Sequence, residues 1–222
     1  VLVAIDDRSL SEIGNWPWDR ARHADLVRSL SANSPRKIVF DVLFLEPGDE
    51  SADRLLAEAI ADAGNVLLSH TFTVRPGTAD EREAVLPLSD LATSSAGLGH
   101  VAVLPDPDGV VRRFDPLVMA GGVATPHLVE TTIVQSGEKS LLAQGHNQPP
   151  ITTMRSAGAF RSISASDVIA GRTPNDFVND KIVIIGATGQ GLGDRYSVPE
   201  YAGRIMSGAE IQANFLSAAL NQ

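Results

Sequence analysis

Residues 181–194 read KIVIIGATGQGLGD, an apolar run that leads directly into a glycine-rich turn. A short continuous apolar run is typical of a strand covered on both faces of a parallel sheet. Glycines at 186, 189, 191 and 193 would let backbone N–H groups approach a phosphate. A dinucleotide site, however, needs the turn to open into a helix, and the proline-containing residues 194–204 follow instead. The stretch therefore predicts a buried strand followed by a glycine-permitted crossover.

The first third of the chain supplies the partners of this strand. Residues 1–6 (VLVAID), 37–44 (KIVFDVLF) and 65–70 (NVLLSH) are apolar runs of the same kind. Between them, residues 21–30 and 52–63 place apolar side chains at helical spacing. This alternation predicts a parallel β-α-β-α-β unit, with the strand at residues 181–186 as a parallel neighbour or near neighbour of the first strand.

The rest of the chain gives weaker signals. The charged residues 73–90 indicate a surface excursion, and Asp106-Pro107-Asp108-Gly109 predicts the turn of an antiparallel hairpin. Thr125 and Pro126 predict the start of a helix that ends near residue 135. A strand is expected near residues 151–155, and two capping boxes predict helix starts at Ser164 (with Asp167) and Ser207 (with Glu210). The predicted fold is α/β: one three-layer domain over residues 1–222, with a mostly parallel sheet flanked by helices and an antiparallel hairpin.

Composition limits the function classes. The 222 residues are 43% apolar, contain no cysteine and carry a net charge of −9, with no basic run that could neutralise a row of phosphates. Nucleic acid is therefore not an expected partner. No apolar stretch is long enough to span a bilayer, but the chain opens inside a strand and closes inside a helix, so we interpret it as a piece of a longer protein.

Polar and aromatic residues gather at the expected strand ends. Ligands of open α/β sheets bind beyond the carboxyl ends of the strands. The candidate ligand-binding residues at these ends are Asp6, Asp7, Trp18, Arg20, Asp41, Glu46, His70 and Thr188. In the alternative interpretation, Asp6 and Asp41 cap turns or pair with arginines, and the tryptophans seal the end of the sheet.

The motifs do not indicate a metal or a nucleophile. His127 and Glu130 have metal-site spacing without a second histidine, and the aspartates around Gly109 lack the spacing of a calcium loop. We predict no catalytic residue, no metal and no cofactor for this chain.

Six segments, in order, carry a family resemblance: residues 1–30, 37–47, 97–114, 163–172, 181–199 and 208–220. Together they resemble the CHASE2 domain over nearly the whole chain. The resemblance implies an extracytoplasmic sensory domain of a bacterial membrane receptor, on the periplasmic or extracellular face of the inner membrane. It also implies flanking membrane segments and a cytoplasmic histidine kinase, nucleotide cyclase or diguanylate cyclase. This chain has Gln212 where the family more often has histidine, and residues 73–90 have no clear counterpart.

Three hypotheses about function follow. The first is a sensor that binds a small molecule or a periplasmic protein and passes the signal through its terminal helix. This hypothesis expects the helix to return to the amino ends of the strands, where Val1 lies. The second is a metal-assisted hydrolase that uses Asp6, Asp41 and Glu46. The third is a structural module that forms a homodimer.

Overall fold

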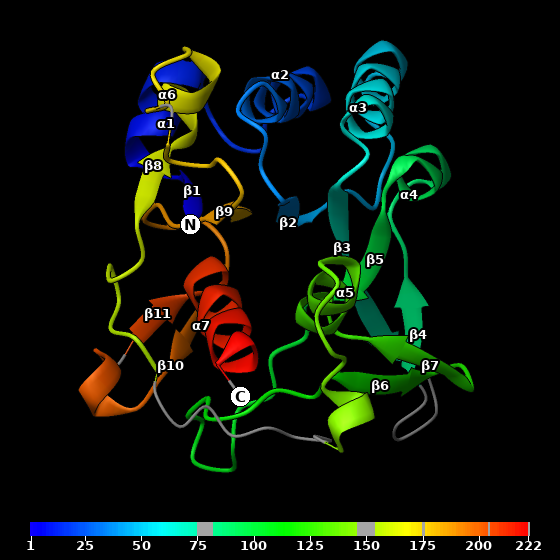
Figure 1. The fold of residues 1–222 in the computed structure, drawn as a ribbon, viewed down its shortest axis with the longest axis vertical. Coiled ribbons are helices and arrows are strands. Elements are labelled where there is room, and N and C mark those ends of the chain that lie inside the picture. The colour runs from blue at the N-terminus through cyan, green and yellow to red at the C-terminus, as the bar shows by residue number, and fades with distance from the viewer. Residues whose placement is uncertain (75–81, 146–153, 175, 204, 222) are drawn as a thin grey trace.

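A mixed sheet forms the middle layer of the molecule (Figure 1). The computed structural model describes residues 1–74, 82–145, 154–174, 176–203 and 205–221. Within these ranges the main sheet has seven strands in the order β4-β3-β2-β9-β1-β8, with β5 also paired to β3. In the described chain, β4 alone runs antiparallel to its neighbour in this sheet. The strands are β1 (Leu2–Ile5), β2 (Lys37–Leu43), β3 (Val66–Val74), β4 (Arg82–Val85), β5 (Gly97–His100), β8 (Ser162–Ser164) and β9 (Ile182–Ala187).

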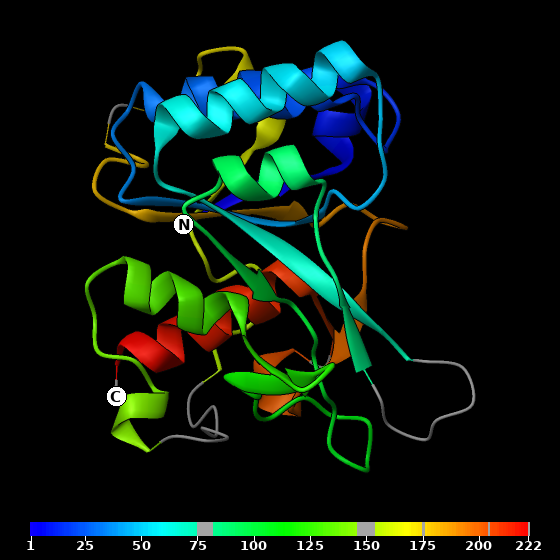
Figure 2. The same cartoon turned by 90° about the vertical axis from the view of Figure 1, so that its right-hand side faces the viewer.

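Helices cover both faces of this sheet (Figure 2). One face carries α1 (Asp7–Ile13), α2 (Arg20–Ser31), α3 (Glu50–Ala63), α4 (Ser89–Ser94) and α6 (Ala165–Ile169). The other face carries α5 (Leu128–Gln135) and α7 (Gly208–Leu220), with the 3-10 turns η1 (Leu142–Gln144) and η2 (Glu200–Ala202). Two antiparallel hairpins lie beyond α5 and α7: β6 (Leu117–Ala120) with β7 (Val123–Pro126), and β10 (Arg195–Ser197) with β11 (Ile205–Ser207). The predicted α/β class, with helices on both faces and an antiparallel hairpin, is confirmed.

The apolar runs fill two cores because successive residues of a strand point to opposite faces. Val3, Phe40 and Ile185 lie in register on the three central strands and pack in one core with α2 and α3. Their neighbours Leu2, Val39 and Ile184 pack in the second core with α5 and α7. Covered on both faces, the strands read as continuous apolar runs in the sequence.

The strand at residues 181–186 lies where the sequence predicted a neighbour of the first strand. β9 pairs in parallel with β1 on one side and with β2 on the other, so it separates the first two strands of the chain. The glycine-rich turn after β9 leads to β10 and not to a helix. Its Gln190 amide donates to the Asp7 carboxylate at 3.0 Å, so a protein anion already occupies this part of the turn.

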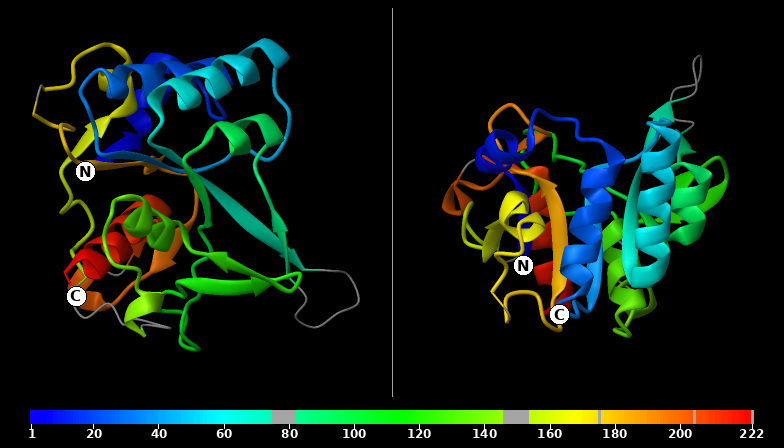
Figure 3. Two further views of the ribbon diagram at one scale, coloured as in Figure 1. Left: turned by 45° about the vertical axis from the view of Figure 1, so that its right-hand side comes forward. Right: turned by 90° about the horizontal axis from the view of Figure 1, so that it is seen from above.

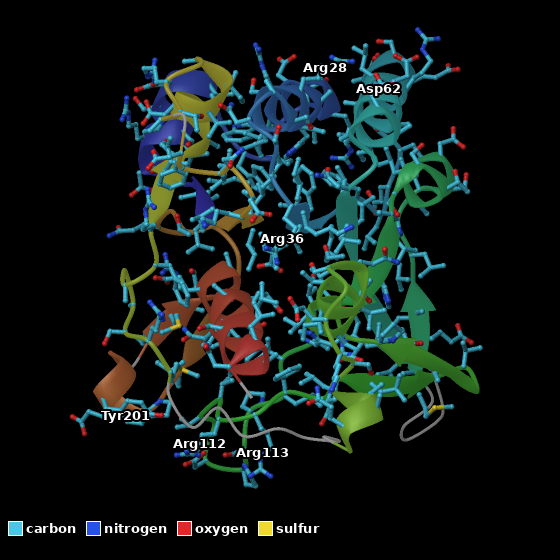
Figure 4. All side chains as sticks on the ribbon, viewed as in Figure 1. Arg28, Arg36, Asp62, Arg112, Arg113 and Tyr201 are labelled. Atoms are coloured by element: carbon cyan, nitrogen blue, oxygen red, sulfur yellow. The ribbon has the colours of Figure 1, made fainter. Side chains whose placement is uncertain are left out.

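The antiparallel hairpin predicted around residues 106–109 does not form. The turn forms, since the Gly109 amide donates to the Asp106 carbonyl at 2.8 Å, but no strand ladder flanks it. The Val111 amide donates to Ser197 instead, and Arg112 and Arg113, side by side at this turn in Figure 4, both pair with Asp106. The hairpin lies at β6–β7, where Gly121 and Gly122 have the positive φ angles that its turn requires.

The structure confirms one of the predicted helix starts and corrects two others. The Ser207–Glu210 capping box of α7 is confirmed. Ser164 does precede α6, but its hydroxyl donates to Asp6 and accepts no backbone N–H of α6, so the predicted box with Asp167 is wrong. α5 starts at Leu128, because residues up to Pro126 pair in β7 and the His127 ring accepts from the Val129 amide. The strand expected near residues 151–155 lies partly outside the described residues, and its described residues are not in a strand.

The two ends of the chain lie on one side of the molecule (Figure 3). α7 begins near the carboxyl ends of β2 and β9 and runs back toward the amino ends of the strands, where Val1 donates to the Ile182 carbonyl. The predicted return of the terminal helix is therefore confirmed.

Candidate functional site

A cavity of about 340 Å³ opens at the carboxyl ends of β2 and β9. After β2 the chain passes to α3 on one face of the sheet, and after β9 it passes to α7 on the other face. Neighbouring strands whose connections leave on opposite faces create the crevice in which open α/β sheets bind ligands. The lining residues are Trp16, Pro17, Arg20, His23, Asp41, Val42, Leu43, Val101, Val103, Ala187, Gly193, Asp194, Tyr196, Gly208, Ala209 and Gln212.

Asp41 is the acidic group at the base of this cavity. Its Oδ2 lies 3.3 Å and 3.4 Å from where Cβ atoms on Gly186 and Gly208 would stand, so its carboxyl touches β9 and the first residue of α7. In the described part of the chain, no hydrogen bond to this carboxyl is formed, and none contributes to its pKa. Burial and the negative charge of Asp194 raise the pKa of Asp41 to about 7. At neutral pH the carboxyl therefore exchanges between its charged and neutral forms.

Asp194 and Tyr196 form the rim of the cavity next to α7. The Tyr196 hydroxyl donates to Asp194 Oδ2 at 3.2 Å, and the Gly208 amide donates to the Asp194 carbonyl at 3.1 Å. Burial and the nearby Asp194 charge raise the pKa of Tyr196, so its hydroxyl stays protonated. The start of α7 is thus tied to the acidic rim.

Aromatic rings form the opposite wall. Trp16 meets Trp18 edge to face at 5.4 Å between ring centroids, and Trp16 meets His23 at 5.7 Å. Burial, followed by the charge of Arg20, lowers the pKa of His23 to about 3, so the imidazole is neutral.

Gln212, on the second turn of α7, also forms part of the cavity wall. Its Nε2 donates to the Val101 carbonyl at 3.4 Å, while its buried Oε1 has no partner among the described residues. The sequence marked Gln212 only as a departure from the resembled family, and it gave no sign of Asp194 and Tyr196 as lining residues. Their place depends on where α7 and the β10–β11 hairpin pack.

The comparison with family models decides the family. The CHASE2 domain model matches residues 1–222, the whole chain. The chain belongs to the CHASE2 domain family. CHASE2 domains are extracytoplasmic, non-catalytic sensory domains of bacterial receptors. Comparison with curated proteins gives no match, and comparison with solved structures gives none either. None of the helices described in this CHASE2 domain is long and apolar enough to cross a bilayer.

Of the eight residues predicted to bind a ligand, all of which are described, Arg20 and Asp41 line the cavity. Arg20 opens α2, and its Nε lies 3.4 Å from Asp53 Oδ1. Its guanidinium also donates to the Glu46 carbonyl at 3.2 Å and lies 4.8 Å from the Phe44 ring centroid. The charge of Arg20 is therefore already paired outside the cavity.

Three of the predicted residues form hydrogen bonds with other parts of the protein and do not line the cavity. Asp6 caps α1 and accepts from the Ser9 amide at 2.8 Å and from the Ser164 hydroxyl at 2.7 Å. Asp7 accepts from Gln190, and Trp18 is buried, with its Nε1 donating to the Gly14 carbonyl at 2.9 Å. These contacts match the alternative in which Asp6 caps a turn and Trp18 seals the sheet.

The remaining three lie away from the cavity lining. Glu46 has an exposed side chain, and His70 is buried beside His100 and Phe72. The Thr188 amide donates to the Ile5 carbonyl at 3.0 Å, and its carbonyl accepts from Arg195 at 2.8 Å. A ligand-binding role for these residues stays a prediction.

The strand-end carboxylates do not form a metal centre in the part of the CHASE2 domain that is described. Asp6 is occupied in the α1 cap, Glu46 is outside the cavity lining, and Asp41 alone of the three lines it. The described residues contain no group of three or more His, Cys, Asp or Glu side chains that could hold a metal ion. Their placement gives the hydrolase hypothesis no support.

Proposed function

We propose that this chain is a single sensory domain of a bacterial transmembrane receptor, outside the cytoplasm, and that the cavity at β2 and β9 is its ligand site. One observation carries this proposal: α7 starts on the cavity and ends on the side of the molecule where Val1 lies. A ligand in the cavity would touch the first two turns of α7, through Gly208, Ala209 and Gln212.

α7 is the element that carries the signal in this proposal. A change at its start moves its far end, because a helix transmits displacement along its axis as a rigid element. The far end lies on the same side as the start of β1, so membrane segments attached there would receive the displacement. The output is then a cytoplasmic histidine kinase, nucleotide cyclase or diguanylate cyclase.

Contacts at Gly186 make the proposal testable. A Cβ at this position would stand 2.7 Å from the Ala209 Cβ, so α7 rests directly on the β9 backbone. Gly186→Ala pushes the start of α7 away from the sheet without adding charge. Gly97→Ala is the matched control, because its Cβ would crowd Thr131 and Leu67 under α5, at 3.0 and 3.3 Å, and leave the cavity lining untouched.

The experiment measures the output activity of the full-length receptor in cells, together with topology reporters at both ends of this domain. We expect Gly186→Ala to shift the basal output and Gly97→Ala to leave it unchanged at equal protein levels. Equal outputs for the two variants, or a reporter pattern that places the domain in the cytoplasm, would refute the proposal.

A further inference from the structure

The charges that line the cavity are not balanced. Asp41 and Asp194 are carboxylates, and the third charged lining residue, Arg20, pairs with Asp53 and packs on Phe44, neither of which lines the cavity. Tyr196 gives Asp194 one hydrogen bond, and His23 is neutral. The charge left for a ligand to meet is therefore negative.

One buried acceptor that lines the cavity also lacks a donor. Gln212 is 2% exposed, and its Oε1 has no partner among the described residues. Its amide group is held at the wall by the bond from Nε2 to Val101, another lining residue. His23 is 1% exposed, and its Nδ1, which donates in one neutral tautomer and accepts in the other, also has no partner within the same described ranges. A buried polar atom without a partner is costly, which favours a ligand that supplies N–H donors.

The other walls favour an organic ligand over a bare ion. The rings of Trp16 and Tyr196 and the side chains of Val101 and Val103 line the cavity. A volume of about 340 Å³ is within the range of sites for small organic molecules. Aromatic faces also attract organic cations.

We infer that the cavity binds a small organic cation, a protonated amine whose N–H groups meet the Asp41 carboxylate and Gln212 Oε1 while its apolar part packs against Trp16. This inference rests on the proposed function of the cavity as the ligand site. It adds the chemical class of the ligand.

The first test compares three compounds with one skeleton on the 1–222 chain. Titration calorimetry at pH 8 uses 2-phenylethylammonium, 2-phenylethanol and 3-phenylpropanoate, which are cationic, neutral and anionic. We expect the ammonium compound to bind at least tenfold more tightly than the alcohol, and the carboxylate not to bind. Equal affinity for the alcohol, tighter binding of the carboxylate, or no binding of the ammonium compound would overturn the inference.

The second test replaces the carboxylates that are proposed to bind the ammonium group. Asp41→Asn should weaken the ammonium compound at least tenfold, and Asp194→Asn should weaken it about threefold, because Asp194 is at the rim. Asp25→Asn, in an exposed pair with Arg22, is the matched control and should leave affinity unchanged. Asparagine has the shape of a protonated aspartate, so the variant should fold; circular dichroism checks this. Unchanged affinity in folded Asp41→Asn would remove Asp41 from the site and overturn the inference.

Lowering the pH gives a readout that does not need a variant. With the Asp41 pKa at about 7, the ionised fraction falls about tenfold between pH 8 and pH 6, and affinity for the ammonium compound should fall equally. Affinity that does not change with pH would also count against the inference. If the amine fails in these tests while Gly186→Ala still shifts receptor output, the ligand class is wrong and the proposed sensory function stands.

Discussion

Asp6 and Asp41 are both aspartates at the end of a buried strand, and their surroundings give them different properties. Asp6 accepts hydrogen bonds from the amide and hydroxyl of Ser9 and from the hydroxyl of Ser164, and it caps α1. Asp41 lies against two glycines, and its carboxyl accepts no hydrogen bond within the described residues. Asp6 therefore stabilises the fold, whereas the Asp41 carboxyl is left without a hydrogen-bond donor at the cavity.

Asp6→Ala tests the first role. The variant loses the cap of α1 and leaves the buried Ser9 and Ser164 hydroxyls short of an acceptor, so unfolding free energy should fall by about 1–3 kcal/mol. Urea unfolding at pH 7 measures this. Asp25→Ala on the surface of α2 is the control and should change stability by less than about 0.5 kcal/mol. Equal effects would show that Asp6 is not a structural cap.

Asp41→Asn tests the second role through stability. A carboxyl whose pKa is raised in the folded state contributes stability at low pH, and this contribution is lost as the pH rises toward 7. The variant should therefore match the wild type near pH 4 and exceed it by roughly 1–3 kcal/mol at pH 8. Urea unfolding across this range is the measurement. A variant less stable than the wild type at pH 8 would contradict the raised pKa.

The sequence predicted residues at the site only where the chain itself marks them. Asp41 lies in the second half of the apolar run at residues 37–44, so its place near the carboxyl edge of the sheet was predictable. Tyr196 and Gln212 belong to elements whose position depends on packing against β9, and no local pattern marks a residue that faces a cavity. The hydrogen bond from Ser164 to Asp6 joins residues 158 positions apart in the sequence, so no local spacing could reveal it.

At the scale of elements, histidines link β3 and β5 to α7. His70 and His100 are in register on neighbouring strands, and His100 meets His127, the N-cap of α5, at 4.8 Å between ring centroids. His127 in turn lies 5.7 Å from Phe215 of α7, whose ring stacks on Phe114 at 4.7 Å. Burial lowers the pKa of all three histidines, so they are neutral in the folded state.

His100→Phe should flatten the acid dependence of stability. Burial, then electrostatic interaction with His70 and Arg82, lowers the pKa of His100 to about 3, against about 6.5 when unfolded. Stability is present above pH 6.5 and falls as the pH drops, by about 1.4 kcal/mol per pH unit for each such histidine. Neither ring nitrogen of His100 has a partner in the described ranges, so phenylalanine should be tolerated at pH 7.5.

Urea unfolding of both proteins at pH 7.5, 6.5, 5.5 and 4.5 checks this. Below pH 6.5 the free energy of unfolding should fall more steeply for the wild type than for the variant. The difference in slope should be about 1.4 kcal/mol per pH unit, which corresponds to one proton. Parallel curves would mean that His100 takes up a proton in the folded state.

Elements with a strong internal pattern were the ones predicted. α2, α3 and α7 have caps and apolar spacing, and they form as expected. α1 was missed because its seven residues directly follow a strand end and bury little apart from Ser9. β4 was missed because residues 82–85 form a strand only by pairing with the outer half of β3, which is a tertiary contact.

At the scale of the whole molecule, protection from solvent is greatest in the middle of the sheet. β9 pairs with β1 and β2, and helices cover both of its faces. β4 pairs with β3 alone among the described strands and lies at the edge. Local opening therefore costs far more free energy at β9 than at β4.

Amide hydrogen exchange followed by mass spectrometry should reflect this order. Peptides from residues 182–187 should exchange at the slowest rate, near the limit set by global unfolding, and peptides from residues 82–85 should exchange orders of magnitude faster. Peptides of β2 should behave like β9. Similar exchange rates at β9 and β4 would show that local opening costs about the same free energy at the centre and at the edge of the sheet.

The position of β9 between β1 and β2 has a consequence for biosynthesis. The first two strands of the chain do not pair with each other, so their facing edges have no partner until residue 187 has been made. Contacts this distant in sequence form slowly, because a long loop must close before they stabilise anything. β2 and β3 pair across α3 alone, but the centre of the sheet is completed only after residue 187 has been synthesised, so the domain closes late and not strand by strand.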